Sequence, residues 1–351
     1  MYAYILKRVL LMVPTLFGVM LITFIVTQFV PGGPVEQLIN QLEGRGAAGE
    51  VASAAGHTIY RGDSGLDREK LAELNKLYGF DKPAHERFIK MMGSYLRFDF
   101  GDSYYHQQSV IGLIVSKLPV SASLGLWTFL IVYLTCIPLG IKKAVRDGTN
   151  FDVTTSTIIL IGYAIPGFVL GIMLLVLLGG GSFWDVFPLR GLTSDNWSEL
   201  SLAGKIGDYL WHITLPVISL VVGSFAVMTM LTKNSFLEEI RKQYVTTARA
   251  KGLSENTVLY KHVFRNAMIP LVTSFPGAFV LSFFAGSLLI EKIFSLDGLG
   301  LLGYESVIKR DYPVVLGTLY IFTLIGLILK LITDICYVWV DPRIQFESLE
   351  S

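Results

Sequence analysis

The sequence predicts an all-α polytopic membrane protein with six transmembrane helices. Of the 351 residues, 52% are hydrophobic and only 16% are charged, whereas a soluble domain carries about 25% charged residues. The charges gather in a few segments and leave six long apolar windows between them. At 1.5 Å per residue, each window is long enough to cross a hydrocarbon core about 30 Å thick.

The first window, within residues 1–30, could also be a cleaved signal peptide. Its apolar stretch exceeds the usual 7–15 residues and ends at Pro31-Gly32-Gly33-Pro34 with no small-x-small cleavage site, so we expect it to remain as the first transmembrane helix.

In the last window Lys330 and Asp334 lie four residues apart, so they can pair on one helical face. The six windows are Val9–Val30, Leu118–Ile141, Val153–Leu178, Tyr209–Thr232, Ile269–Ile290 and Tyr312–Trp339.

Basic residues in the short loops predict the orientation. The loops after the second and fourth windows are rich in lysine and arginine, whereas the loop 181–208 has more acidic than basic residues. Because basic loops stay in the cytoplasm, both termini are expected there. The basic residues are Lys142, Lys143, Arg146, Lys233, Arg241, Lys242, Arg249, Lys251, Lys261 and Arg265.

The segment 31–117 is then expected on the external, periplasmic side. Residues 43–65 are rich in Gly, Ala and Ser and indicate a flexible insertion. A helix capped by Ser64 should follow and end at Gly79, and a second should begin near Pro83. This cap could be a tether that packs on the spans or a docking surface for a soluble partner. The expected inward side chains are Leu71, Leu74 and Tyr78, then Phe88, Met91, Met92 and Tyr95.

The core, residues 118–345, should hold the other five spans. Pro166, Pro216 and Pro276 are expected to interrupt the third, fourth and fifth spans. Residues 298–303 satisfy G-x-G-x-x-G, but no strand precedes them, so we interpret them as a tight external corner whose glycines adopt unusual backbone angles. Cys136 and Cys336 lie in apolar stretches and indicate packing residues.

No enzymatic chemistry is indicated. The chain contains no G-x-x-x-x-G-K-[ST] phosphate loop, no cysteine/histidine cluster with zinc spacing and no defensible catalytic triad or carboxylate pair. The net charge of +1 gives no reason to expect a nucleic-acid partner. We therefore expect no catalytic residue, metal or cofactor in this chain.

The cytoplasmic loop 233–268 is the most informative segment. Residues 235–250 are predicted to form one helix, because Phe236, Ile240, Tyr244 and Ala248 recur at helical spacing. Gly252 should turn the chain in the left-handed region, and Ser254 should cap a second helix that runs to Pro270.

Residues 244–253 (YVTTARAKGL), followed by 265–270 (RNAMIP), resemble the coupling loop of peptide-type ABC importer permeases. Thr246-Thr247-Ala248 stands where the general pattern of that family has Glu-Ala-Ala. Further segments along nearly the whole chain are similar to the family, and their amino-acid sequences are most similar to its Yej branch. They are residues 78–83, 96–103, 118–121, 164–168, 290–295, 310–315 and 341–344.

The resemblance implies a type I ABC importer permease with a periplasmic cap between its first two helices, in a bacterial inner membrane. It implies three protein partners: a second permease subunit, a cytoplasmic ATPase that holds ATP and Mg²⁺, and a periplasmic peptide-binding protein. The implied substrates are oligopeptides and peptide-like compounds, including microcin C-type antibiotics. The implied ATPase-coupling residues are Tyr244, Thr247, Ala248, Arg249, Ala250, Lys251, Gly252 and Leu253.

We expect small residues at Ala248, Ala250 and Gly252 to let the ATPase approach closely, and Arg249 and Lys251 to reach its acidic groups. The path candidates are Pro166, Phe168, Met173, Phe275, Phe279 and Phe283. A secondary transporter would need charged residues at mid-membrane to couple ions, and none occurs in the middle of a window. A non-transporting scaffold would not need the glycine-turned loop.

Overall fold

The computed structural model describes residues 2–29, 81–180, 183–284 and 286–340, and within them it is helical without a β-strand longer than an isolated bridge. Five helical segments are long and apolar enough to cross a membrane, and a sixth is present if one sharply bent pair counts as a span. The all-α polytopic prediction is therefore confirmed. The segments are α1 (Tyr2–Phe29), α6 (Val110–Val145), α9 (Leu202–Ile240), α13 (Ile269–Phe284) with α14 (Leu288–Ile293), and α16 (Tyr312–Val340).

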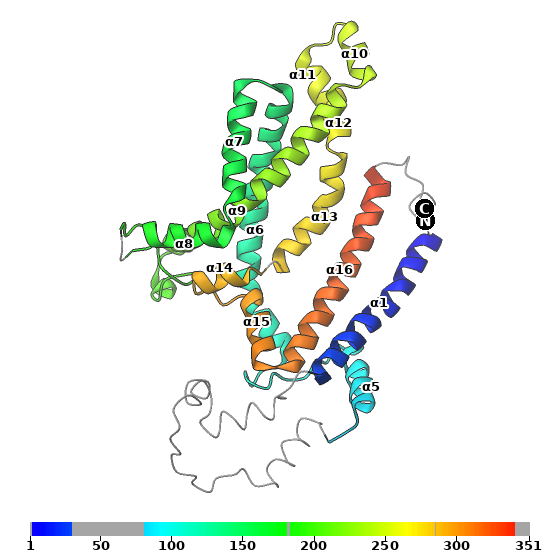
Figure 1. Ribbon diagram of the computed structural model, residues 1–351, viewed down its shortest axis with the longest axis vertical. Coiled ribbons are helices and arrows are strands. Elements are labelled where there is room, and N and C mark those ends of the chain that lie inside the picture. The colour runs from blue at the N-terminus through cyan, green and yellow to red at the C-terminus, as the bar shows by residue number, and fades with distance from the viewer. Residues whose placement is uncertain (1, 30–80, 181–182, 285, 341–351) are drawn as a thin grey trace, which may run out of the picture. The chain divides into compact units, whose positions relative to one another are not determined.

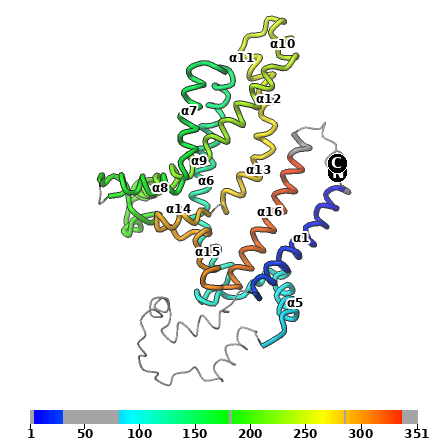
Figure 2. The backbone as a smooth tube through the Cα atoms, viewed as in Figure 1, coloured from blue at the N-terminus to red at the C-terminus, as the bar shows by residue number. Residues whose placement is uncertain are grey.

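The bent pair is α7 (Asn150–Ala164) and α8 (Gly167–Leu178), which meet at 89°. Pro166 donates no backbone hydrogen bond and disfavours helical geometry at Ile165, whose φ of −87° and ψ of 118° are extended. The predicted third span therefore turns a right angle, visible at the α7–α8 junction (Figures 1 and 2).

The other two prolines behave differently from expectation. Pro216 lies inside the continuous helix α9, and Pro276 lies inside α13. The fifth span is instead interrupted between Phe284 and Leu288, where a side chain on Gly286 would collide with the backbone of Gly300. The predicted interruptions at Pro216 and Pro276 were wrong, because a membrane helix absorbs a proline when neighbouring groups satisfy the freed carbonyl.

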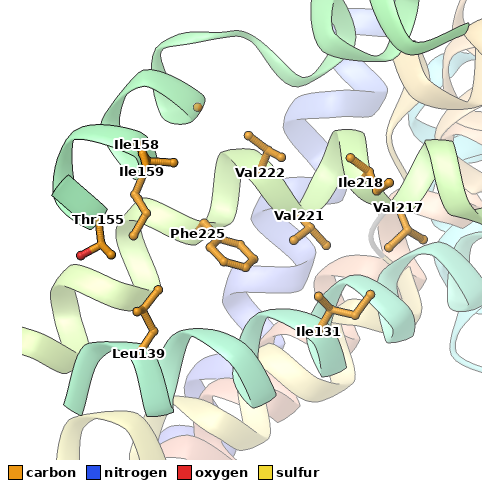
Figure 3. A pocket seen from close by; sticks show the side chains of 11 residues that line it. Ile131, Leu139, Thr155, Ile158, Ile159, Val217, Ile218, Val221, Val222 and Phe225 are labelled. Carbon is orange, nitrogen blue, oxygen red and sulfur yellow. The ribbon is translucent and has the colours of Figure 1, made fainter. Parts of the chain in front are cut away.

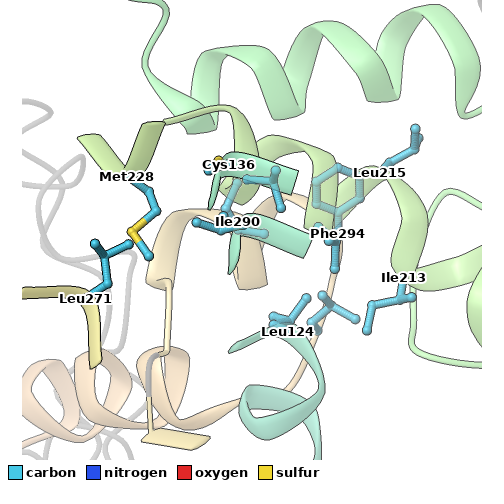
Figure 4. Packing of buried hydrophobic residues seen from close by; sticks show 12 residues of the cluster. Leu124, Cys136, Ile213, Leu215, Met228, Leu271, Ile290 and Phe294 are labelled. Carbon is cyan, nitrogen blue, oxygen red and sulfur yellow. The ribbon is translucent and has the colours of Figure 1, made fainter. Parts of the chain in front are cut away.

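The described chain divides into two compact units. One contains the described residues within 1–8, 116–302 and 325–340, and the other contains those within 9–115 and 303–324. The core of the first unit is a cluster of buried apolar side chains, mostly from α6, α9, α13 and α14 (Figure 4), in which Cys136 is 0% exposed. Cys136 and Cys336 are both free thiols, as predicted.

In the second unit, α5 (Ala84–Tyr95) is the helix predicted near Pro83. Phe88 on α5 lies against Phe17 and Phe24 of α1, with ring centroids 5.5 and 5.2 Å apart. Tyr95 packs against Phe100 and Tyr320 in the same way. The insertion 43–65 and the helix predicted over residues 64–79 lie outside the described residues.

Helix α15 (Leu299–Lys309) begins at the glycine motif, and a buried carboxylate holds its first turn. Glu291 accepts hydrogen bonds from the backbone N–H of Leu301 (2.6 Å) and Gly300 (3.4 Å) and from the Ser121 hydroxyl (3.3 Å). None of the glycines at 298, 300 and 303 has a positive φ. The first of them, Gly298, is needed for close approach to Glu291, not for an unusual backbone angle.

The predicted pairing of Lys330 with Asp334 was wrong. Asp334 instead accepts from the Tyr4 hydroxyl at 3.0 Å and pairs with the Arg8 guanidinium at 3.1 Å. Arg8 comes from the other end of the chain, a partner that sequence spacing along one helix cannot reveal.

Candidate functional site

The loop between the fourth and fifth spans forms a helical hairpin at the C-terminal end of α9 (Figure 1). Helix α9 has 39 residues, about 58 Å at the α-helical rise, so it projects well beyond a bilayer core. It ends at Ile240, and α10 (Gln243–Ala250) follows after an extended Lys242 with ψ of 151°. The single helix predicted over 235–250 is therefore two helices.

Glu239 stabilises the helix break between α9 and α10 through its hydrogen bonds. Its carboxylate accepts from the Lys242 ammonium and, at 2.7 Å, from the Tyr244 hydroxyl, which itself accepts from the Asn266 amide at 3.3 Å. The hydrogen bond with Glu239 raises the pKa of Lys242. Burial, followed by the hydrogen bond to Glu239, raises the pKa of Tyr244. Both groups therefore keep their protons at neutral pH.

The turn of the hairpin confirms two local predictions. Gly252 has φ of +78°, in the left-handed region that glycine adopts without strain. The Ser254 hydroxyl accepts from the Thr257 N–H at the start of α11 (Glu255–Thr257). Arg249 and Glu255 close the turn by a two-point ion pair at 2.9 and 3.0 Å. The second arm of the hairpin continues through the π-helical turn η2 (Val258–Val263) and α12 (Phe264–Ala267).

The inner face of the hairpin packs on the ends of two spans. Val245 and Ala248 of α10 join a buried cluster with Ile141 of α6 and Phe236 of α9. The methyl group of Ala248 is buried in this cluster, so Ala248 faces the spans, whereas Ala250 and Gly252 are exposed. Arg249 pairs with Glu255, and both side chains are exposed at 43% and 73%, so the guanidinium stays on the outer face of the hairpin.

The outer face of the hairpin is exposed. Nothing in the chain lies within 4 Å of the position that a side chain on Gly252 would take. Leu253 is an apolar side chain that is 38% exposed next to this open position. The exposed predicted coupling residues are Thr247, Arg249, Ala250, Lys251, Gly252 and Leu253.

The path candidates fall into two groups. Phe275, Phe279 and Phe283 lie along α13, with successive ring centroids 5.8 and 5.3 Å apart. Phe168 and Met173 lie on α8, which packs against α9 and α14 and points to the opposite side of α9 from α13 in Figure 1. Pro166 lies at the bend that precedes α8.

Sequence reasoning missed two aromatic residues of the first group. Phe129 and Tyr133 on α6 have ring centroids 4.2 Å apart, and Phe129 lies 5.3 Å from Phe275 and 5.4 Å from Phe279. Their spacing of four residues within the second window was the available signal. The result is a ladder of five rings between α6 and α13.

Across the described ranges, no three His, Cys, Asp or Glu side chains are grouped to hold a metal ion. The site instead consists of a helical hairpin whose inner face packs on the ends of long membrane helices and whose turn is exposed.

Comparison with known proteins bears directly on this arrangement. Residues 136–346 match the family described as binding-protein-dependent transport system inner membrane component. The chain is 59% identical to the peptidoglycan transport system permease protein YejB of Agrobacterium fabrum, across 99% of both chains. It is 56% identical to the inner membrane ABC transporter permease protein YejB of Escherichia coli O157:H7, across 99% of this chain and 100% of the other.

A more distant relative is the oligopeptide transport system permease protein AppB of Bacillus subtilis, 32% identical across 99% of this chain and 100% of the other. Matches of this length and identity confirm the resemblance and the permease fold, and they place the protein among transport subunits, not enzymes. The chain belongs to the family of binding-protein-dependent transport system inner membrane components, as a multi-pass inner-membrane permease subunit of the peptide-type ABC importers.

Proposed function

We propose that this subunit moves oligopeptides or peptide-like compounds from the periplasm to the cytoplasm. The full-length similarity to permeases named for oligopeptide and peptidoglycan transport supports a peptide-bearing substrate. The geometry that carries the proposal is the glycine-turned hairpin, whose outer face is exposed while its inner face is fixed to α6 and α9. A transporter without a separate motor would have no use for such a surface.

In this proposal a cytoplasmic ATPase binds ATP and Mg²⁺ and docks on the turn around Ala250 to Leu253. Both termini lie in the cytoplasm, as the basic loops indicate. A second permease subunit completes the path, and a periplasmic peptide-binding protein delivers the substrate. Closure of the ATPase rocks the helices between inward- and outward-open states.

The aromatic ladder is the proposed wall of the path. Phe129 is buried and supports the other four rings, of which Phe275 is 42% exposed and Tyr133, Phe279 and Phe283 are partly exposed. The exposed parts of these four rings accept apolar side chains of varied shape by dispersion and edge-to-face contact without demanding one polar pattern. Phe168 and Met173, both exposed on α8, form a second candidate surface. Weak selectivity here leaves substrate choice to the binding protein.

The test is uptake by the assembled transporter. The four components are reconstituted in vesicles of phosphatidylethanolamine and phosphatidylglycerol, and import of a tritiated tryptic digest of casein is compared with import of labelled peptidoglycan fragments. ATP-dependent import of either pool supports the proposal and names the substrate class. Import that needs an ion gradient and no ATP contradicts it.

Gly252→Asp tests the hairpin within the same assay. The new side chain meets open space, and Asp tolerates the left-handed region, so the chain itself should fold normally. We expect uptake to be lost while membrane insertion and abundance remain unchanged. Gly101→Asp is the matched control, because Gly101 has φ of +73° and equally open surroundings but lies outside the hairpin. Wild-type uptake by Gly252→Asp removes the coupling assignment.

A further inference from the structure

Five charged side chains form one connected group where α6, α7 and α9 meet below the hairpin. Burial increases along the group, from an Arg241 side chain that is 69% exposed to a Lys143 side chain that is 0% exposed. Lys143, Asp152 and Lys233 lie at the ends of the uncharged windows, Asp147 lies in the turn between α6 and α7, and Arg241 lies at the C-terminal end of α9. The members are Lys143, Asp147, Asp152, Lys233 and Arg241.

Lys143 fastens α6 to the first turns of α7. Its ammonium donates to the Asp152 carbonyl (2.8 Å), the Thr155 hydroxyl (2.8 Å) and the Ser156 hydroxyl (2.7 Å). It also lies 2.9 Å from the Asp152 carboxylate. A fully buried ammonium with this set of acceptors fixes the two helices in one register.

Lys233 adds α9 to the same group. Its ammonium lies 2.7 Å from Asp152 and 2.9 Å from Asp147 in the α6–α7 turn. Asp147 also pairs with Arg241 at 3.3 Å. Arg241 caps the end of α9, directly before the hairpin helix α10. The charged group thus connects the base of the hairpin to α7.

Such a group is not explained by stability alone. Burying paired charges gains little over apolar packing of equal volume, but removing one partner is strongly destabilising, so the ions specify which elements meet.

The packing beside the group leaves room for α7 to move. An apolar groove of about 550 Å³ lies between α6, α7 and α9, and Thr155, which bonds Lys143, forms part of its wall. The groove is open to the surroundings, since Ile158 and Ile218 on its wall are 64% and 40% exposed. Figure 3 shows Ile158 and Ile159 of α7 facing Val221, Val222 and Phe225 of α9 across it. Because this groove is open, no side chain of the described residues fills the space beside α7, and α7 can tilt about its charged end.

We propose that Asp152 and Lys233 are positioning residues that transfer displacement of α10 to α7. Because α7 ends at the right-angled Ile165–Pro166 bend, a tilt of α7 swings α8, which packs on α14. The inference rests on the proposed role of the hairpin in coupling and adds a route from that hairpin to the third span.

The experiment measures ATP hydrolysed per peptide imported, in the reconstituted transporter and with the tritiated casein digest as probe. For Lys233→Met we expect assembly and ATP hydrolysis to persist while the ATP consumed per peptide rises about tenfold, within the usual range of coupling between sites. Lys233→Arg, which keeps the charge, should restore most of the wild-type ratio. Lys309→Met, which removes an exposed ion pair with Glu305, is the matched control and should leave the ratio unchanged.

Two outcomes overturn the inference: an unchanged ratio in Lys233→Met, or a parallel fall in uptake and hydrolysis that signals a purely structural role. If Lys233→Met fails to assemble, Asp147→Asn replaces it as the test, because the Asp147 side chain is 36% exposed and its loss is better tolerated. We expect this variant to consume about three times as much ATP per imported peptide as the wild type. If Gly252→Asp loses uptake but Lys233→Met consumes the wild-type amount of ATP per peptide, only this inference is refuted. Normal uptake in Gly252→Asp refutes the proposed function itself.

Discussion

The contact between Gly298 and Glu291 gives a quantitative prediction. A methyl group at position 298 would lie 2.6 Å from the Glu291 carboxyl carbon and from Oε1, and 2.8 Å from the Ser121 hydroxyl. To reach ordinary van der Waals distance the carboxylate must retreat by about 0.8 Å. That movement weakens its part-buried hydrogen bonds to the Gly300 and Leu301 N–H groups.

Two weakened hydrogen bonds to the fully buried Glu291 carboxylate correspond to a loss of about 2–3 kcal/mol for Gly298→Ala. In a chain of this length such a loss lowers the melting temperature by about 5 °C. The assay is fluorescence-detected size-exclusion chromatography of the detergent-solubilised protein after heating.

Gly303→Ala, in the helix α15 that begins directly after Gly298, is the control, because nothing lies within 4 Å of its new methyl group. It should melt at or above the wild-type temperature, since alanine favours a helix. Glu291→Asp, one methylene shorter, should partly rescue Gly298→Ala. Equal melting temperatures for Gly298→Ala and Gly303→Ala refute the reasoning.

Two further predictions concern the hairpin and the second unit. Burial and the hydrogen bond to Glu239 raise the pKa of Tyr244, so this contact is fully present below the ordinary tyrosine pKa of about 10 and is lost only as pH rises through the raised value. Tyr244→Phe should therefore lower uptake by the same factor from about pH 6 to 8, and a loss confined to one end of that range contradicts the assignment. Phe100→Ala removes a ring that is 4% exposed and should lower the free energy of unfolding by about 3–5 kcal/mol. Phe98→Ala, at a ring that is 54% exposed, should lower it by less than about 0.5 kcal/mol. Similar shifts in melting temperature for the two variants contradict the packing described.

Local rules predicted much of the fold. Uncharged windows located the membrane helices because the bilayer penalises charge regardless of tertiary context. Gly252 and Ser254 were predictable because a left-handed turn and a helix cap depend on neighbouring residues only. Helix α5 followed from its apolar spacing.

Features that depend on distant residues were not predictable. Pro166 indicated a kink, but the 89° angle depends on α8 packing on α9 and α14. The partners of Asp334 and the aromatic neighbours of Phe275 come from other helices. The buried Lys143 looked like an ordinary basic loop residue, because only the folded chain places Asp152, Thr155 and Ser156 around it.

The measurement that tests the central claim most directly is photo-crosslinking from the hairpin to the ATPase. A benzophenone amino acid is placed at Ala250, exposed on α10, and in a second variant at Leu134, which is 72% exposed on the span portion of α6. Irradiation of native membranes should join the Ala250 variant, and not the Leu134 variant, to the ATPase subunit. No ATPase adduct from Ala250, or equal adducts from both positions, contradicts the claim that this hairpin is where the motor meets the permease.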